Sequence, residues 1–289
     1  MRPILFFILI VTVKMSFSQD VQLQILDNEL NKPFEFSSLA IRNDTIFLPT
    51  ENCKTIFYVD KITKKVIGKD YFEVLGKSDL EGITVFKNYI FVADEEDNNI
   101  QFINITTKAI TKLKIHDIDS NQNTNHDFGL EGIKMNKKGT YLYVLKELNK
   151  NYESEIYCFN VTFKNNLFFL ALDKKIVIRL DRSHRYTDLA LSEDETKLYL
   201  LRSKIGGYYI DHIDITNLKS TFYFKDLATI DISKSVNTYS KLGYNSNMEG
   251  LAVDGNSLYL ISDNYNGRDN TCDDPVNEKS KTLFLEVKL

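Results

Sequence analysis

The sequence predicts an all-β fold, a five-bladed β-propeller closed by an N-terminal strand. Three observations predict it. A short phrase with an acid, a glycine and an apolar residue recurs along the chain, a second apolar run follows each copy, and a third run ends in a turn that contains threonine. Units of this kind, repeated every roughly 45 to 60 residues, are typical of propellers.

The recurring phrase is Leu-Glu-Gly-Ile at residues 80–83 and 130–133, and Met-Glu-Gly-Leu at residues 248–251. Degenerate copies at residues 37–41 and 187–191 fill the gaps. Each phrase should open the innermost strand of a blade. The second apolar runs should form the next strand, and they lie at residues 45–48, 89–94, 141–145, 198–201 and 258–263.

The second repeat illustrates the four strands expected in each blade. They cover residues 82–86, 89–93, 100–105 and 109–115, and the first two are joined by a hairpin-like link. The third strand recurs in the other repeats, before a turn that contains threonine. Its copies lie at residues 56–60, 156–160 and 210–214.

The last repeat has no fourth strand, because the sequence ends at Leu289 just after the strand expected at residues 283–287. Residues 21–26 alternate like a strand and precede the first repeat. Pairing of these two segments would close the ring without exposed edges. Two alternatives stay open: a sixth blade within residues 217–245, and an open β-sandwich.

The N-terminus predicts export. Residues 4–13 form an apolar run too short to span a bilayer, and Ser16 and Ser18 are small residues spaced as a signal peptidase requires. Cleavage after Ser18 leaves residues 19–289 as a single domain, secreted or periplasmic, with no membrane span. A retained membrane anchor is the alternative. The mature protein is expected to be a monomer.

Composition excludes some partners and sites. The net charge is −4 with the two signs interspersed, so nucleic acid is not an expected partner. No zinc-type spacing and no Gly-x-Ser-x-Gly elbow occurs. Cys53 and Cys272 each follow the second strand of neighbouring blades, so a disulfide between them is conceivable, whereas Cys158 should be a buried free thiol.

The repeated acids predict a site at one mouth of the central channel. Residues just before the innermost strand, and residues at the end of the antiparallel second strand, should meet at the same mouth. Converging carboxylates repel one another, and a hard cation such as Ca²⁺ relieves that repulsion. The predicted metal ligands are Glu81, Glu131, Asp188, Glu249 and Asp263. A strand-entry turn, with no metal, is the alternative role of these acids.

Cations are expected at the same mouth. Lys146 and Arg202 end second strands, while His184 and Arg185 precede the innermost strand of the fourth repeat. An arginine fork suits a phosphate or carboxylate, so these four residues are the predicted substrate-binding groups, and a small phosphorylated molecule is the predicted ligand. Scattered surface charge is the alternative for each of them.

The chain resembles the family named for the esterase-like activity of phytase. The resemblance lies in the repeated Glu-Gly openings, in Thr-Asp-Leu-Ala at residues 187–190 with Arg202, and in Glu-Gly-Leu-Ala at residues 249–252 followed by Ser-Asp-Asn at 262–264. It covers nearly all of the mature chain. The calcium-binding propellers of the SdiA-regulated group are similar too. The first blade departs from the pattern, because residues 37 and 38 are serines.

The resemblance implies a phosphoric monoester hydrolase of the phytase or esterase-like kind. In that interpretation Ca²⁺ would hold the phosphate, a metal-polarised water would attack, and Arg185 and Arg202 would stabilise the developing charge. No catalytic nucleophile is assigned. The competing interpretation is a non-enzymatic propeller of the cell envelope that binds a ligand or a protein at the same mouth.

Overall fold

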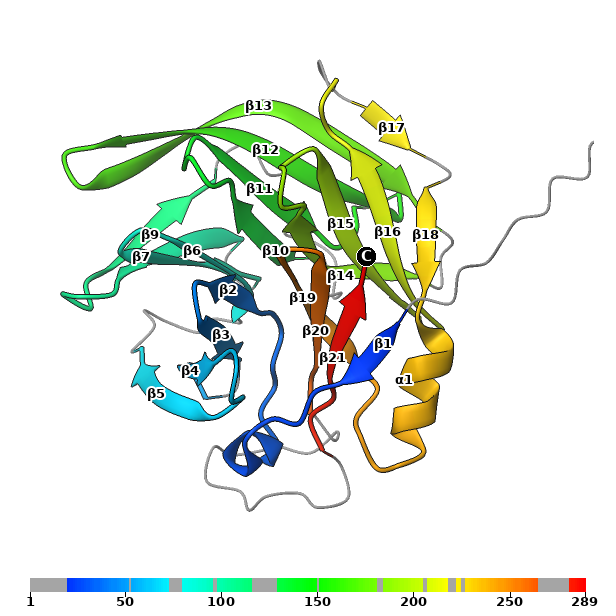
Figure 1. Ribbon diagram of the computed structural model, residues 1–289. Coiled ribbons are helices and arrows are strands. Elements are labelled where there is room, and N and C mark those ends of the chain that lie inside the picture. The colour runs from blue at the N-terminus through cyan, green and yellow to red at the C-terminus, as the bar shows by residue number, and fades with distance from the viewer. Residues whose placement is uncertain are drawn as a thin grey trace, which may run out of the picture.

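The structure is a computed structural model that describes residues 20–51, 53–72, 80–95, 98–115, 129–149, 151–180, 184–204, 207–217, 222–224, 227–264 and 281–289. Five antiparallel sheets stand around a central axis (Figure 1). The predicted five-bladed β-propeller is confirmed.

Each blade starts at the axis and runs outward. Blade 1 contains β2 (Ala40–Arg42), β3 (Thr45–Thr50), β4 (Thr55–Asp60) and β5 (Val66–Tyr71). Blade 2 contains β6 (Leu80–Phe86), β7 (Tyr89–Asp94), β8 (Asn99–Asn104) and β9 (Ile110–Lys114). Blade 3 contains β10 (Leu130–Met135), β11 (Tyr141–Lys146), β12 (Glu153–Lys164) and β13 (Leu167–Arg179).

Blades 4 and 5 complete the ring. Blade 4 contains β14 (Arg185–Leu191), β15 (Lys197–Lys204), β16 (Gly207–Asp214) and β18 (Ala228–Asp231). Blade 5 contains β19 (Met248–Asp254), β20 (Ser257–Ser262), β21 (Phe284–Lys288) and β1 (Val21–Leu23). The turn η1 (Asn28–Asn31) lies between blade 5 and blade 1 in sequence.

The N-terminal strand closes the ring as predicted. Strand β1 pairs antiparallel with β21, with Val21 opposite Val287 and Leu23 opposite Leu285. The first and last strands of the described chain therefore share one blade, beside each other in Figure 1. The predicted signal peptide at residues 1–18 lies outside the described residues.

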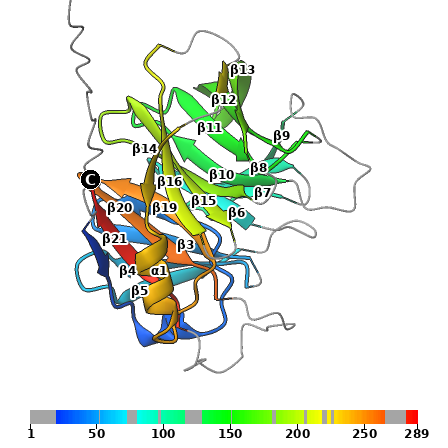
Figure 2. The ribbon, with the colours of Figure 1, turned by 90° about the vertical axis from the view of Figure 1, so that its right-hand side faces the viewer.

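The alternative of a sixth blade is wrong, because the described part of residues 217–245 forms no further sheet. In its place, β18 supplies the fourth strand of blade 4, and β17 (Phe222–Phe224) adds in parallel to the outer edge of β13. Helix α1 (Ser233–Ser240) then packs on the outside near β16, and Figure 2 shows it beside blade 5. Strands β17 and β18 therefore extend blades that already exist, and in the sequence such strands resemble part of a further repeat. In the part of the chain that is described, no helix has the length and apolar character needed to cross a membrane.

The core lies between neighbouring blades, in five apolar clusters. Ile133 packs toward blade 2 beside Phe91, and Leu189 packs toward blade 3 beside Leu145. Successive residues of a strand point to opposite faces, so the next residue of each inner strand packs toward the following blade. Ala190, for example, packs with Met248 in the cluster between blades 4 and 5. This alternation rigidly fixes the orientation of every inner strand.

Candidate functional site

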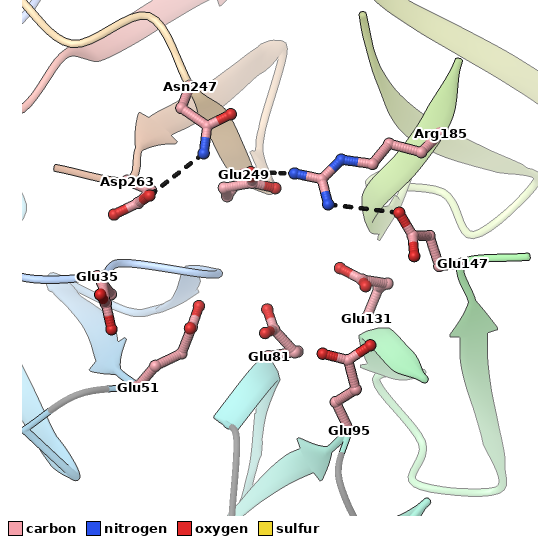
Figure 3. Close-up of a pocket in the computed structure, with 10 residues that line it drawn as sticks. All are labelled: Glu35, Glu51, Glu81, Glu95, Glu131, Glu147, Arg185, Asn247, Glu249 and Asp263. Carbon is pink, nitrogen blue, oxygen red and sulfur yellow. Dashed lines mark hydrogen bonds and ion pairs between the residues drawn. The ribbon is translucent and has the colours of Figure 1, made fainter. Parts of the chain in front are cut away.

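The recurring Glu-Gly pair lies in a β-bulge at the start of the inner strand. The pairing of inner and second strands shifts between Leu80 and Ile83, and again between Leu130 and Ile133. The same shift occurs at Met248 in blade 5. Bulges re-aim side chains. Here the re-aimed side chains are glutamates that face the channel mouth (Figure 3).

The glycine of each pair allows neighbouring inner strands to touch. A Cβ atom on Gly82 would lie 2.7 Å from the carbonyl oxygen of Glu131. A Cβ atom on Gly132 would lie 2.8 Å from Oδ1 of Asp188 in the next blade. No side chain fits at such distances, so the glycine allows the inner strands to pack closely at the axis. The glutamate before it points to the mouth.

The mouth is a cavity of about 530 Å³. Acids from two repeated positions meet there: the residue that opens the inner strand, and the residue that directly follows the second strand (Figure 3). Among the described residues, the lining consists of Glu35, Glu51, Glu81, Glu95, Glu131, Glu147, Arg185, Asn247, Glu249 and Asp263. Eight carboxylates thus share the cavity with one guanidinium.

Arg185 joins two blades across this mouth. Its Nη2 donates to Oε1 of Glu249 at 2.7 Å, and its Nη1 donates to Oε1 of Glu147 at 3.3 Å (Figure 3). The proximity of these acids raises the pKa of the Arg185 guanidinium. Two of the eight carboxylates therefore have a fixed cation as partner.

Burial and mutual repulsion act on the acids of this lining. Burial, followed by repulsion from Glu81 and Glu147, raises the pKa of Glu131 well above its ordinary range. Burial also raises the pKa of Glu147 to about 7, although Arg185 opposes that rise, and it raises the pKa of Glu249. Such shifts mean that these buried carboxyl groups keep their protons to a higher pH than a solvated glutamate does.

The donor set fits a hard divalent cation. One carboxylate oxygen from each of Glu95, Glu131 and Glu147 lies within 4.8 Å of the others. Calcium binds oxygen at about 2.3–2.6 Å, so ligands on opposite sides of one ion lie up to about 5 Å apart. These three glutamates, from blades 2 and 3, could hold one ion, with Glu81 beside them.

The structure brings four of the five predicted metal ligands to the mouth. Glu81, Glu131, Glu249 and Asp263 line the cavity, but Asp188 does not. In the strand pairing, Asp188 takes the place of the glycine and not that of the glutamate. This one-residue offset turns its carboxylate to the axis beneath the mouth.

There the Asp188 carboxylate accepts hydrogen bonds from Ser38 Oγ at 2.7 Å, Leu251 N at 2.8 Å and its neighbour Leu189 N at 2.7 Å. Its protein partners are thus donors from blades 1, 4 and 5. Asp188 holds blades together, which corrects the prediction that it joins the acids of the mouth.

Of the four predicted substrate-binding residues, one lines the cavity and three do not. Arg185 lines the cavity, whereas the Arg202 guanidinium donates to Asp211 at 2.7 Å and lies 4.4 Å from the ring centre of Tyr209. The His184 ring is 6.0 Å from the same tyrosine, and Lys146 is buried within blade 3. Arg202, His184 and Lys146 are not among the described lining residues.

A second acidic position repeats from blade to blade, and of its members only Asp263 is among the predicted metal ligands. Glu51, Glu95 and Glu147 each directly follow a second strand, as Asp263 does, and this repetition was available as a signal. Asn247 donates to Asp263 at 3.2 Å. Glu35 comes from the connection before blade 1, where no repeat marks it.

The cysteines agree in part with the sequence prediction. Cys53 is disulfide-bonded, and Cys158 is a buried free thiol whose pKa burial raises to about 12. Cys272, the predicted partner of Cys53, lies outside the described residues.

A family model described as esterase-like activity of phytase matches residues 18–265. The chain belongs to this phytase-like family. Its bulged Glu-Gly openings are thus those of a phytase-like propeller. No curated protein matches the chain.

Two solved structures are similar to this phytase-like chain at low identity. The glutaminyl cyclase of Myxococcus xanthus is 10% identical with a TM-score of 0.58, over 93% of this chain and 97% of that chain. The hydrazine synthase of Kuenenia stuttgartiensis is 15% identical with a TM-score of 0.44, over 88% of this chain and 58% of that chain. At such identity the likeness to the cyclase shows the fold alone.

Proposed function

We propose that this phytase-like propeller is exported, binds Ca²⁺ at the acidic mouth and hydrolyses a small phosphomonoester there. The observation that carries the proposal is the cluster of Glu95, Glu131 and Glu147 oxygens beside the Arg185 guanidinium. Without a metal, so many carboxylates repel an anionic substrate. A bound cation and a nearby arginine together form a site for a phosphoryl group.

Each group at the mouth has its own role in the proposed hydrolysis. Bound Ca²⁺ would supply a Lewis acid that neutralises phosphate oxygens. Glu249 holds the arginine fork at the cavity by its 2.7 Å hydrogen bond, so that the fork can meet the charge that develops on the phosphoryl group. The described lining contains no serine, cysteine or histidine. Water is therefore the attacking group in this proposal, and the ester P–O bond is the bond that breaks.

The second candidate function is a non-enzymatic propeller of the cell envelope that binds a ligand or protein loop. One observation favours it: Arg202, the cation that the family resemblance assigns to the site, is bound by Asp211. Arg185 is then the sole cation of the described lining, and acids already hold it. Such a mouth suits a cationic ligand or a metal-bridged protein contact.

One experiment separates these functions. Chelator-treated protein is assayed on an aryl phosphate with and without added Ca²⁺, beside the variant Glu131→Gln. The matched control is Glu29→Gln, which removes an exposed acid paired with Lys69 on the outside of blade 1. Hydrolysis should require Ca²⁺, fall strongly in Glu131→Gln and persist in Glu29→Gln. Calcium binding without any hydrolysis would support the binding protein instead.

A further inference from the structure

A second cavity lies at the opposite mouth of the propeller axis. It has a volume of about 360 Å³, and the C-terminal ends of all five inner strands surround it. The acidic mouth is built from the other ends of these strands. The residues that matter most for the second cavity are Arg42, Thr84, Lys134, Lys137, Glu193 and Asp254.

Lys134 breaks the pattern of the repeat in this cavity. It follows Ile133 on the inner strand of blade 3, where the equivalent residues of the other blades are small. Those equivalents are Ala40, Thr84, Ala190 and Ala252. The three alanines are fully buried, whereas Lys134 is half-buried. A lysine at this position is therefore a specific feature of blade 3.

The ammonium group of Lys134 has no ion-pair partner among the residues that the structure describes. The charge that acts on it is the carboxylate of Asp188, which forms no ion pair with it. Burial lowers the pKa of Lys134, which shows that its surroundings do not fully compensate its charge. Lys134 thus faces the second cavity as a partly desolvated cation.

The acids of the second cavity have other partners. Glu193 forms an ion pair with Lys137, and Asp254 forms one with Lys61 at 2.8 Å. The side chain of Glu195 accepts a hydrogen bond from the backbone N–H of Lys137. None of these contacts involves Lys134, so these acids do not form an ion pair with its ammonium group.

Arg42 adds a second cation to the rim. Its guanidinium donates to the carbonyl oxygen of Lys87 and lies 5.8 Å from the ring centre of Phe47. Neither contact neutralises its charge, and no carboxylate pairs with it within the described part of the chain. Lys134 and Arg42 together present two positive charges, neither of them in an ion pair with a described residue, to a cavity large enough for a small molecule.

We propose that the second cavity binds a small oxyanion, with Lys134 as its main partner and Arg42 at the rim. Phosphate and carboxylate share the required chemistry, because both offer oxygens that accept charge-assisted hydrogen bonds from an ammonium or guanidinium group. The site is distinct from the acidic mouth, which repels anions in the absence of metal. The axis then carries a cation site at one end and an anion site at the other.

The test uses metal-free, chelator-treated protein, titrated calorimetrically with inorganic phosphate, acetate and glycerol phosphate in separate experiments. We expect saturable binding of one anion per chain by at least one of the three probes. Lys134→Ala, which installs the residue of three other blades, should weaken binding at least tenfold, and Lys134→Arg should retain it. Arg185→Gln at the acidic mouth and Lys69→Ala on the outer strand of blade 1 should leave it unchanged.

Three results would overturn the proposal: no saturable binding of any probe, equal affinity in Lys134→Ala, or loss of binding in Arg185→Gln. A second measurement needs only the parent protein. Lysines are acetylated with an activated ester and their modification rates are read by mass spectrometry. The anion should protect Lys134 several-fold more than it protects exposed Lys69, and equal protection of both would contradict the site even if Lys134→Ala failed to fold.

Discussion

Ser38 and Asp188 meet across the propeller axis, where Ser38 Oγ donates a hydrogen bond of 2.7 Å to the Asp188 carboxylate. The two residues belong to blades 1 and 4, which are not neighbours in the ring. They occupy the position at which the other three blades have glycine. Ser38 Oγ also accepts from Ile83 N of blade 2 at 3.3 Å, and Asp188 accepts from Leu251 N of blade 5 at 2.8 Å. Four blades are therefore hydrogen-bonded at one point of the axis.

Asp188→Ala should destabilise the fold without affecting the acidic mouth. The substitution leaves three buried donors without an acceptor, and each such loss costs roughly 1–3 kcal/mol. We expect a loss of at least about 3 kcal/mol in the free energy of unfolding by urea titration. Asp188→Asn keeps an amide oxygen as acceptor and should lose less. If Asp188→Asn folds normally but no longer binds Ca²⁺, Asp188 is a metal ligand after all.

The same carboxyl should make stability depend on pH. Burial, against three hydrogen bonds, raises the pKa of Asp188 to about 8, while an aspartate in the unfolded chain titrates near 4. The folded state then binds the proton more tightly, so this group's contribution is greatest below about pH 4 and falls as the pH rises through about 8. The melting temperature of parent protein, minus that of Asp188→Asn, should decrease from pH 5 to pH 8. A difference that is constant or rises over this range would contradict the assignment.

The repeat made the fold predictable, because each blade reuses one local pattern. The phrase at Glu81, Glu131 and Glu249 marks the inner strand, and its position also places the acid at the mouth. What escaped prediction depends on distant pairing. The sequence already places Asp188 one residue past the acidic position, where the other repeats have glycine. The paired strands show the consequence: its carboxylate accepts hydrogen bonds from blades 1 and 5 at the axis and does not line the mouth.

Arg202 illustrates the second limit. Its position at the end of a second strand suggested the mouth, yet the neighbouring strand β16 places Asp211 within hydrogen-bonding distance and Tyr209 beneath the guanidinium. Arg185 does line the mouth, because it lies at the very start of β14 and its side chain reaches acids of blades 3 and 5. Charge on a strand end does not by itself say which direction a long side chain takes.

The cysteines give a prediction independent of the site. Cys53 is disulfide-bonded and Cys158 is a buried free thiol. Thiol titration of denatured, unreduced protein should find one free group. The native protein should react slowly, since burial raises the pKa of Cys158 to about 12 and the thiolate is the reactive form. Three free groups after denaturation would show that no disulfide forms in solution.

Calcium should stabilise the protein by binding only to the folded state. An ion at 100 times its dissociation constant adds about 2.7 kcal/mol, which calorimetry detects as a rise of several degrees in the melting temperature. Glu131→Gln keeps the size of the side chain and removes a charge from the Glu95 and Glu147 cluster, so it should reduce the calcium-dependent shift. Glu29→Gln should not. A parent protein with no calcium-dependent shift would exclude a shared metal.

Arg185→Gln should separate metal binding from catalysis. The Arg185 guanidinium holds Glu249 at 2.7 Å and Glu147 at 3.3 Å, so it competes with a metal ion for the same acids. Its loss leaves the acids without a cation, which should lower the melting temperature of metal-free protein. The more negative mouth should bind Ca²⁺ about tenfold more tightly, a difference of roughly 1.4 kcal/mol.

Hydrolysis of an aryl phosphate should fall in the same variant by about 10²-fold or more, the usual effect of removing one donor to a developing charge. Arg185→Lys keeps the positive charge without the planar fork, so it should retain parent-like calcium affinity while recovering only part of the activity. These opposite effects distinguish a substrate-binding arginine from one that only stabilises the ring. If Arg185→Gln weakens calcium binding and hydrolysis together, the arginine acts by holding the metal ligands in place.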